Sequence, residues 1–303
     1  MILKEDFIMY SIIPFQVSKT LSESLYSLKR CSGQCHSIFN SCINFTLKEN
    51  FLFSLLLETK PIHSRAVQIN QNDWFYHRLH QIEPGDKIYF NDDRLEIPSL
   101  SLLIPFSRSY VWDPEEWSES PKSSMSNLWR NAEFIRKVLF DEERIVSFPC
   151  EFKILFQNRI ASLRYAFKEN SLSKAMDAIA HLIGFGPGLT PSGDDFIVGF
   201  ISSYHFLKKS KFNLSINMND FVEQILLLYK NKTTFISEMM IYEACKGRFF
   251  KPIVELMRNI FFSDQKNSLV SAYRLTKIGS TSGIDILRGI ICGIELYTNS
   301  YEG

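Results

Sequence analysis

Residues 184–195 form a glycine-rich segment that separates two apolar segments with helical periodicity. Over residues 172–183, apolar side chains recur at the i, i+3, i+4, i+7 spacing of one helical face, and Gly184 stands where a left-handed cap is expected. Three glycines at alternate positions then allow a sharp turn and the close approach of another group. Ser192 is the expected N-cap of the next helix, with Asp195 completing a capping box. The segment therefore predicts a helix end, a tight loop and a defined helix start.

A second copy of this helix start lies near the C-terminus. Aligning Ser192 with Ser282 gives the shared pattern Ser-Gly-x-Asp-x-x-x-Gly. The matched pairs are Gly193 and Gly283, Asp195 and Asp285, and Gly199 and Gly289. In each copy the aspartate and the second glycine lie on one helical face, where a glycine lets another helix or a ligand come close. We therefore expect the two helix N-termini to converge on one shared site.

The chemistry of a helix N-terminus favours an anion, because its free N–H groups and partial positive charge attract phosphate or carboxylate. Asp194, Asp195 and Asp285 would repel a bare anion. Either the aspartates turn away as caps, or a cation such as Mg²⁺ or the amide end of a substrate lies between them and the anion. Capping and packing alone would explain either copy. The repetition, together with the glycine loop, favours a ligand site.

The candidate residues of this site follow from the two copies. Those expected to be catalytic are Asp194, Asp195 and Asp285. Those expected to bind the anion are Gly186, Gly188, Thr190, Ser192, Gly193, Thr281, Ser282 and Gly283. Secondary candidates are His36 and Ser37 near the N-terminus, and Thr234 and Ser237, which are three residues apart on one helical face. A structural histidine and hydroxyls bonded to their own backbone are the alternative explanations for this second group.

The fold class predicted from the remaining pattern is α+β. Short apolar runs separated by turn residues predict a small antiparallel β-barrel or sandwich over residues 1–112. A segment rich in proline, serine and charge predicts a linker over residues 113–127, and helical periodicity predicts an α-helical bundle domain over residues 128–303. The predicted strands are 39–45, 51–57, 66–69, 87–90, 95–97 and 102–104.

Charge and composition exclude several classes of protein. The formal net charge is +1 without a long run of one sign, so neither nucleic acid nor an anionic membrane is expected as a partner. The N-terminus lacks a signal h-region, and no apolar run reaches the ~18 residues of a membrane span, so a cytoplasmic protein is expected. Cys31 and Cys35 precede His36, but no second pair follows at zinc spacing, and free thiols are expected.

Residues 183–196 resemble the signature of a bacterial domain-of-unknown-function family that includes the AllH-type subunit of oxamate carbamoyltransferase. The resemblance extends over most of the chain. It includes His36, Ser37 and Asn44, the turn at Gly85–Asp86, the Thr234 and Ser237 helix, and residues 278–285. Ser280 stands where the family usually has histidine. If that histidine transfers a proton in other members, this chain lacks or replaces that step.

The resemblance implies a role in oxalurate phosphorolysis, which converts oxalurate and phosphate into oxamate and carbamoyl phosphate during anaerobic allantoin catabolism, a part of purine nitrogen metabolism. It also implies a multi-subunit complex with FdrA-like and AllG-like partners. A non-catalytic assembly or regulatory subunit of such a complex is the alternative. A nucleotide-binding P-loop is disfavoured, because its lysine is absent and no strand precedes the glycine loop.

Overall fold

The computed structural model describes residues 10–28, 30–48, 51–76, 79–91, 93–115, 125–140, 150–209 and 216–299. The chain divides into two compact units, Met1–Glu116 and Trp117–Gly303, and each is described by itself. Residues 116–124 of the predicted linker lie outside the described residues. No helix in the described ranges combines the length and apolarity that crossing a membrane requires.

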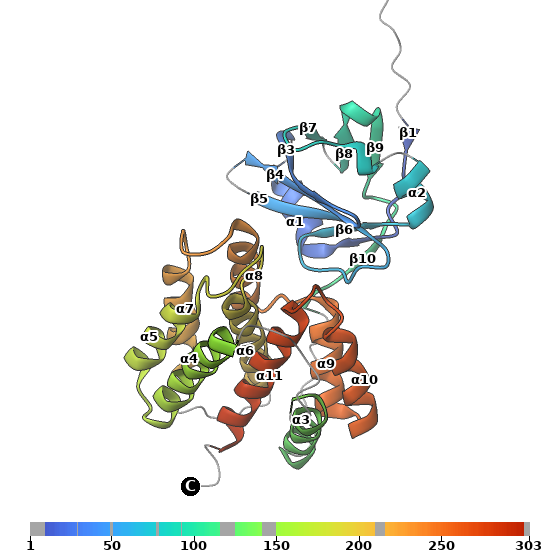
Figure 1. Ribbon diagram of the computed structural model, residues 1–303. Helices are drawn as coiled ribbons and strands as arrows, with labels where there is room; N and C mark the ends of the chain where they lie inside the picture. Colours follow the sequence, from blue (N-terminus) through green and yellow to red (C-terminus); the bar gives the residue numbers. More distant parts are fainter. Residues whose placement is uncertain are drawn as a thin grey trace, which may run out of the picture. The chain divides into compact units, whose positions relative to one another are not determined.

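The first unit is built on a curled sheet with ten strands in its described residues (Figure 1). Helices α1 (Lys19–Leu28) and α2 (Gln71–Tyr76) accompany it, with short 3-10 turns at Leu79–Gln81 and Pro98–Leu100. The strands are β1 (Tyr10–Ser11), β2 (Gln16–Ser18), β3 (Arg30–Phe39), β4 (Cys42–Leu47), β5 (Phe51–Leu57), β6 (Ala66–Ile69), β7 (Lys87–Asn91), β8 (Arg94–Ile97), β9 (Leu102–Pro105) and β10 (Tyr110–Trp112).

The strand order is β1-β9-β8-β7-β3-β4-β5-β6-β2-β10, and the sheet is mixed. The pairs β1/β9, β2/β10 and β5/β6 are parallel, whereas the others are antiparallel. The predicted α+β class is therefore confirmed, but the prediction of a purely antiparallel sheet is wrong. Strands that follow one another closely favour hairpins, whereas the parallel pairs here join strands that are distant in the chain or separated by a loop.

Alternation along β4 and β5 decides which side chains face the main core of this unit. Ile43 and Phe45 on β4 pack into that core with Phe53 and Leu55 on β5, while Cys42, Asn44 and Ser54 lie on the opposite face. A turn at residues 40–41 separates β3 from β4, so the predicted single strand over residues 39–45 is wrong. Apolar residues on both sides of the turn made the two strand ends look like one continuous strand in the sequence.

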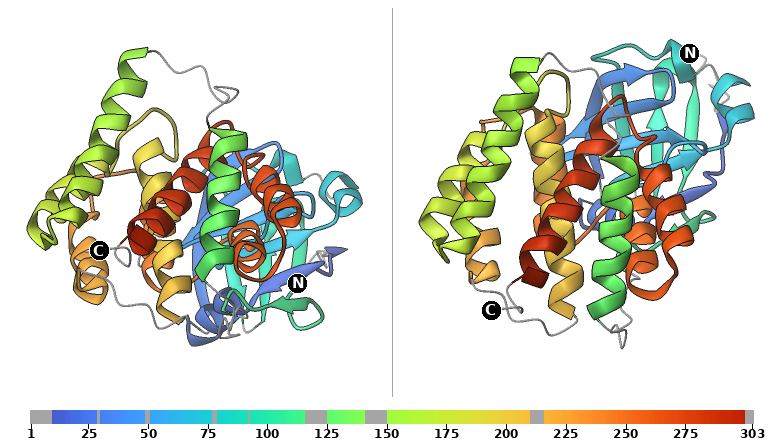
Figure 2. Two further views of the ribbon diagram at one scale, coloured as in Figure 1. Left: turned by 90° about the horizontal axis from the view of Figure 1, so that it is seen from below. Right: turned by 60° about the horizontal axis from the view of Figure 1, so that its bottom comes forward.

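The second unit is helical in its described residues, and two of its helices occupy the centre (Figure 2). Every residue of α6 from 192 to 204 is buried, as are nearly all of α11 from 283 to 294. The helices are α3 (Met125–Leu139), α4 (Cys150–Lys168), α5 (Leu172–Leu182), α6 (Ser192–Lys209), α7 (Met218–Leu228), α8 (Phe235–Cys245), α9 (Lys251–Phe262), α10 (Gln265–Leu275) and α11 (Ser282–Asn299).

Glycines let α6 and α11 pack with their backbones in contact. A Cβ atom on Gly199 would lie 1.9 Å from the carbonyl oxygen of Ile286, and one on Gly289 would lie 2.0 Å from the carbonyl oxygen of Phe196. Neither glycine can carry a side chain without moving the facing helix. The second glycine of each copied pattern therefore serves helix packing, and it brings the two helix starts side by side (Figure 2).

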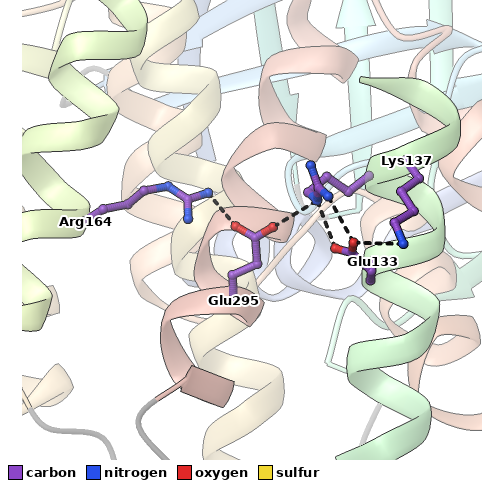
Figure 3. Close-up of polar contacts among 5 residues, drawn as sticks. Glu133, Lys137, Arg164 and Glu295 are labelled. Atoms are coloured by element: carbon purple, nitrogen blue, oxygen red, sulfur yellow. Dashed lines mark hydrogen bonds and ion pairs between the residues drawn. The ribbon is translucent and has the colours of Figure 1, made fainter. Parts of the chain in front are cut away.

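Charged side chains hold α11 between α3 and α4 on the side shown in Figure 3. The carboxylate of Glu295 on α11 lies 2.5 Å from Arg164 Nη2 on α4 and 3.7 Å from Arg136 Nε on α3. Arg136 also contacts Glu133, at 2.9 Å, and lowers the pKa of that carboxyl to about 2. One acidic residue of α11 therefore forms ion pairs with both flanking helices.

Candidate functional site

The starts of α6 and α11 meet, as the repeated pattern predicts. Thr190 Oγ1 and Ser282 Oγ, each next to one helix start, are 2.8 Å apart in a hydrogen bond. The first helical bonds of α6 run to the carbonyl of Pro191, which accepts from the N–H groups of residues 194 and 195. In α11 the carbonyl of Thr281 accepts from residues 284 and 285 in the same way. The two starts have the same local geometry and share one hydroxyl contact.

The predicted capping box is wrong. Helix α6 already includes Ser192, so the residue before it is Pro191, whose fixed φ angle suits a helix start and which has no N–H to satisfy. Asp195 accordingly makes no capping hydrogen bond to the described backbone, and its side chain is fully buried. Of the two explanations for the aspartates, turning away as caps is therefore excluded for Asp195.

The first glycines of the copied pattern serve packing. A Cβ atom on Gly193 would lie 1.9 Å from the carbonyl oxygen of Leu182, and one on Gly283 would lie 1.9 Å from that of Leu275. Their N–H groups donate to the carbonyls of residues 185 and 278, at 2.8 and 3.0 Å. The anion-binding role of these two glycines stays a prediction, and neither N–H group is available to support it.

The glycine loop needs the freedom of glycine at two of its positions in particular. Gly186 has φ 124° and Gly188 has φ 97°, conformations that residues with side chains rarely adopt. A Cβ atom on Gly186 would lie 2.7 Å from the backbone nitrogen of Ser192, whereas one on Gly188 would meet nothing within 4 Å. The loop thus lies directly against the start of α6 at one glycine and leaves open space at the other.

Asp194 ties together three segments of the second unit. Its Oδ1 accepts a 2.8 Å hydrogen bond from the N–H of Gly184, and its Oδ2 accepts one from the hydroxyl of Thr233. Burial raises the pKa of Asp194, while these donors and the hydroxyl of Ser237 lower it. Thr233, before α8, was not among the sequence candidates, because no local pattern indicates a partner so distant in the chain. Both oxygens of Asp194 are thus engaged by the chain itself.

Asp195 has a different environment. Its side chain is 0% exposed, and neither carboxyl oxygen has hydrogen-bond geometry with any described residue. Burial raises the pKa of Asp195 well above its usual range. The nearby hydroxyls of Ser282 and Thr190 lower this pKa, while the carboxyls of Asp285 and Asp194 raise it further. The protonated, neutral form of Asp195 is therefore favoured far more than for an ordinary aspartate.

Asp285 occupies the matching position on α11 and carries an ion pair. Its Oδ1 lies 2.6 Å from Arg288 Nη1, and its Oδ2 lacks a hydrogen-bond partner among the described residues. Burial raises the pKa of Asp285, whereas Arg288 and the hydroxyl of Ser192 lower it. The effect is reciprocal: Ser282 of α11 lowers the pKa of Asp195 of α6, and Ser192 of α6 lowers the pKa of Asp285 of α11. Arg288 was missed, although its i, i+3 spacing from Asp285 is a signal that the sequence carries.

Comparison with protein families matches the same regions. The model described as oxamate carbamoyltransferase subunit AllH matches residues 182–294, and the model of the AllH family N-terminal domain matches residues 14–110. The chain belongs to the AllH family. No solved structure matches it. The family resemblance seen in the sequence is therefore confirmed, and the AllH match includes both helix starts.

The remaining candidates of this AllH-family chain lie in two places. Thr234 caps α8 by accepting from the N–H of Ser237 at 3.2 Å, and its hydroxyl donates to the carbonyl of Leu189 in the glycine loop. Ser237 is buried next to Asp194. His36 and Ser37 lie on β3 in the first unit and contact each other. Ser280, where the resemblance implies a histidine, is exposed in the turn before α11.

A metal ion has little support from the side chains that the structure describes. Within those ranges, no group of three or more histidine, cysteine, aspartate or glutamate residues is arranged to hold one. Asp194 is occupied by its own donors, and Asp285 is paired with Arg288. The aspartates of the described ranges therefore do not fit a protein-built Mg²⁺ site.

Proposed function

We propose that this AllH-family chain is a subunit of an oxamate carbamoyltransferase and binds the carbamoyl-bearing substrate at the paired starts of α6 and α11. The observation that carries the proposal is Asp195, a fully buried carboxyl without a hydrogen-bond partner among the described residues. Leaving a buried polar group unpaired costs about 1–3 kcal/mol. A ligand that pairs with Asp195 would offset that cost.

The carbamoyl group of the proposed substrates offers the hydrogen-bond partners that the carboxyl of Asp195 lacks among the described residues. A carbamoyl group presents an NH2 donor and a carbonyl acceptor, so it can pair with a carboxyl in either protonation state. Thr190 and Ser282 are only partly buried, and their hydrogen bond to each other is the contact that an incoming ligand would exchange for its own. Both hydroxyls would then become donors or acceptors for the ligand.

The charged part of the substrate needs a partner as well. Phosphate, oxamate, oxalurate and carbamoyl phosphate are anions. Donors next to the carboxyls include the hydroxyls of Thr190, Ser192 and Ser282 and the guanidinium of Arg288. The partial positive charge at two adjacent helix starts adds to this attraction. In this proposal the anion lies toward Arg288 and the hydroxyls, and the carbamoyl NH2 lies toward Asp195 and Asp285.

Activation would come from position and charge. A planar carbamoyl group held between acceptors for its NH2 and donors for its developing oxyanion is aligned for attack by phosphate or oxamate. Asp194 acts as a positioning residue here, since its oxygens hold Gly184 and Thr233. Subunits of the FdrA-like and AllG-like types are the proposed partners that complete the enzyme.

The test is turnover of the reconstituted enzyme, measured as carbamoyl phosphate formed from oxalurate and phosphate. Asp195→Asn and Asp285→Asn should each lower kcat about 10²–10³-fold, the usual effect of removing one preorganised electrostatic contact. Asp177→Asn is the matched control, because Asp177 is exposed on α5. Unchanged turnover in both site variants would sink the proposal and leave an assembly role for this chain.

A further inference from the structure

A bulge in β3 brings two reactive side chains together in the first unit. Cys35 pairs with Phe45 and Ser37 pairs with Asn44 on β4, so His36 is the extra residue between two consecutive pairs. Neighbouring residues of a regular strand point to opposite faces. Here the bulge instead brings His36 Nδ1 within 3.1 Å of Ser37 Oγ.

A row of hydrogen bonds across β5, β4 and β3 sets the direction of this contact. The Ser54 hydroxyl and the Cys42 thiol both donate to Asn44 Oδ1, at 2.7 and 3.3 Å. This orients the Asn44 amide so that its Nδ2 donates to Ser37 Oγ at 3.0 Å. Ser37 Oγ accepts this bond and keeps its own proton. In the His36 tautomer that carries its hydrogen on Nε2, that proton is donated to Nδ1.

We propose that Ser37 is a nucleophile with His36 as its general base, and that the hydroxyl accepts a carbamoyl group. The nature of the donor rests on the proposed function, whereas the reactivity of Ser37 rests on the bulge and the hydrogen-bond row alone. A hydroxyl hydrogen-bonded to a histidine acceptor is the arrangement that activates serine nucleophiles. The Asn44 N–H adds a donor that stabilises charge developing on Ser37 Oγ.

Cys42, in the same row, does not take this role. Burial raises the pKa of the Cys42 thiol to about 12, so it stays protonated and serves as a donor to Asn44. Asn44 and Ser54 are buried, with 5% and 3% of their surfaces exposed, while Ser37 is half-buried at the end of the row and His36 is exposed. The hydroxyl beside His36 is therefore the nucleophile that a donor can reach.

The proposed step conserves atoms and charge. Ser37 Oγ forms a bond to the carbamoyl carbon while its proton passes to His36 Nδ1. The bond from that carbon to the leaving nitrogen or oxygen breaks, and the leaving group takes the proton from His36. An oxygen of hydrogen phosphate then attacks the carbamoyl carbon and gives its proton to His36 Nδ1. The bond from that carbon to Ser37 Oγ breaks, and His36 returns the proton to Ser37, which leaves as its hydroxyl. The product of the second step is carbamoyl phosphate.

The test uses the full chain and 4-nitrophenyl carbamate, which transfers a carbamoyl group and releases coloured 4-nitrophenolate. We expect a burst of one equivalent of nitrophenolate and a carbamoyl group on the peptide containing Ser37, located by mass spectrometry. Ser37→Ala should abolish both. His36→Ala should slow the burst about 10²–10⁴-fold, the range for general base catalysis, and added imidazole should restore part of the rate. A purely structural His36 would not show that rescue.

Two controls separate this inference from the proposed function. Ser27→Ala removes an exposed hydroxyl that bonds within α1, and it should leave the burst unchanged. Asp195→Asn lies in the other unit and should also leave the burst intact, even where it abolishes turnover. An unaltered burst in Ser37→Ala, or label confined to lysines and cysteines, overturns the assignment while leaving the helix-start proposal standing.

Discussion

Gly199→Ala is the most quantitative perturbation that the structure offers. The added Cβ would lie 1.9 Å from the carbonyl oxygen of Ile286, where ordinary contact begins at 3.4 Å, so the local gap between α6 and α11 must widen by about 1.5 Å. The obstructing atom belongs to the backbone of a buried helix and cannot rotate away. The two central helices would therefore have to separate where their starts converge.

The size of the effect follows from two opposing contributions. Overpacking a core costs about 1–3 kcal/mol of unfolding free energy. Because the neighbour of Gly199 is a rigid backbone, we expect Gly199→Ala to cost about 3 kcal/mol. Replacing a helical glycine by alanine returns about 1 kcal/mol of helix propensity. The net expected loss is about 2 kcal/mol of unfolding free energy. For a unit of this size that corresponds to a decrease in Tm of roughly 4–8 °C.

Thermal unfolding followed by circular dichroism measures this loss, with Gly289→Ala as a second variant from the other side of the same contact. Ser173→Ala, on the exposed side of α5, is the control for a harmless alanine. A Gly199→Ala protein that unfolds within about 1 °C of the wild type would refute the backbone contact and, with it, the stated reason for the paired glycines.

Two further predictions concern buried polar groups. Burial lowers the pKa of His63 to about 3, and its Nδ1 accepts a hydrogen bond from the N–H of Arg65. Below pH ~6.5 His63 is therefore protonated in the unfolded chain but stays neutral in the folded chain. The free energy of unfolding, measured by urea titration, should then fall by about 2 kcal/mol between pH 6.5 and 5. His63→Gln should remove this loss. An equal loss in the wild type and the variant would contradict the role of His63. Asp194→Asn turns one acceptor of the Gly184 and Thr233 bonds into a donor, and it should lower unfolding free energy by about 1–3 kcal/mol. A stable Asp194→Asn protein in the same titration would mean that those bonds do not hold the loop.

Local patterns predicted the helical site well. The end of α5, the glycine loop and the paired starts of α6 and α11 were all readable, because helix periodicity and glycine positions act over a few residues. The start of α6 was misplaced by one residue, since the carbonyl of Pro191 accepts the first helical hydrogen bonds and Ser192 is already the first helical residue. The bond from Thr233 to Asp194 could not be read, because no local spacing relates the two.

The sheet was harder to predict. Its parallel pairs depend on which distant strands meet, and two-residue strands such as β1 carry almost no pattern. Helix α1 was missed within a region that otherwise indicates strands. The contact of His36 with Ser37 contradicts simple alternation, and only the observed pairing of β3 with β4 reveals the bulge that permits it.

Ligand-dependent thermal unfolding of the full chain shows whether the paired helix starts bind the carbamoyl-bearing substrate. Phosphate, oxamate and carbamoyl phosphate are each added with and without Mg²⁺. A ligand at about 100 times its Kd adds about 2.7 kcal/mol if it binds only the folded state. We predict such a shift with carbamoyl phosphate. It should be lost in Asp195→Asn and Asp285→Asn and kept in Asp177→Asn. An equal shift in all four proteins, or none in the wild type, would contradict it.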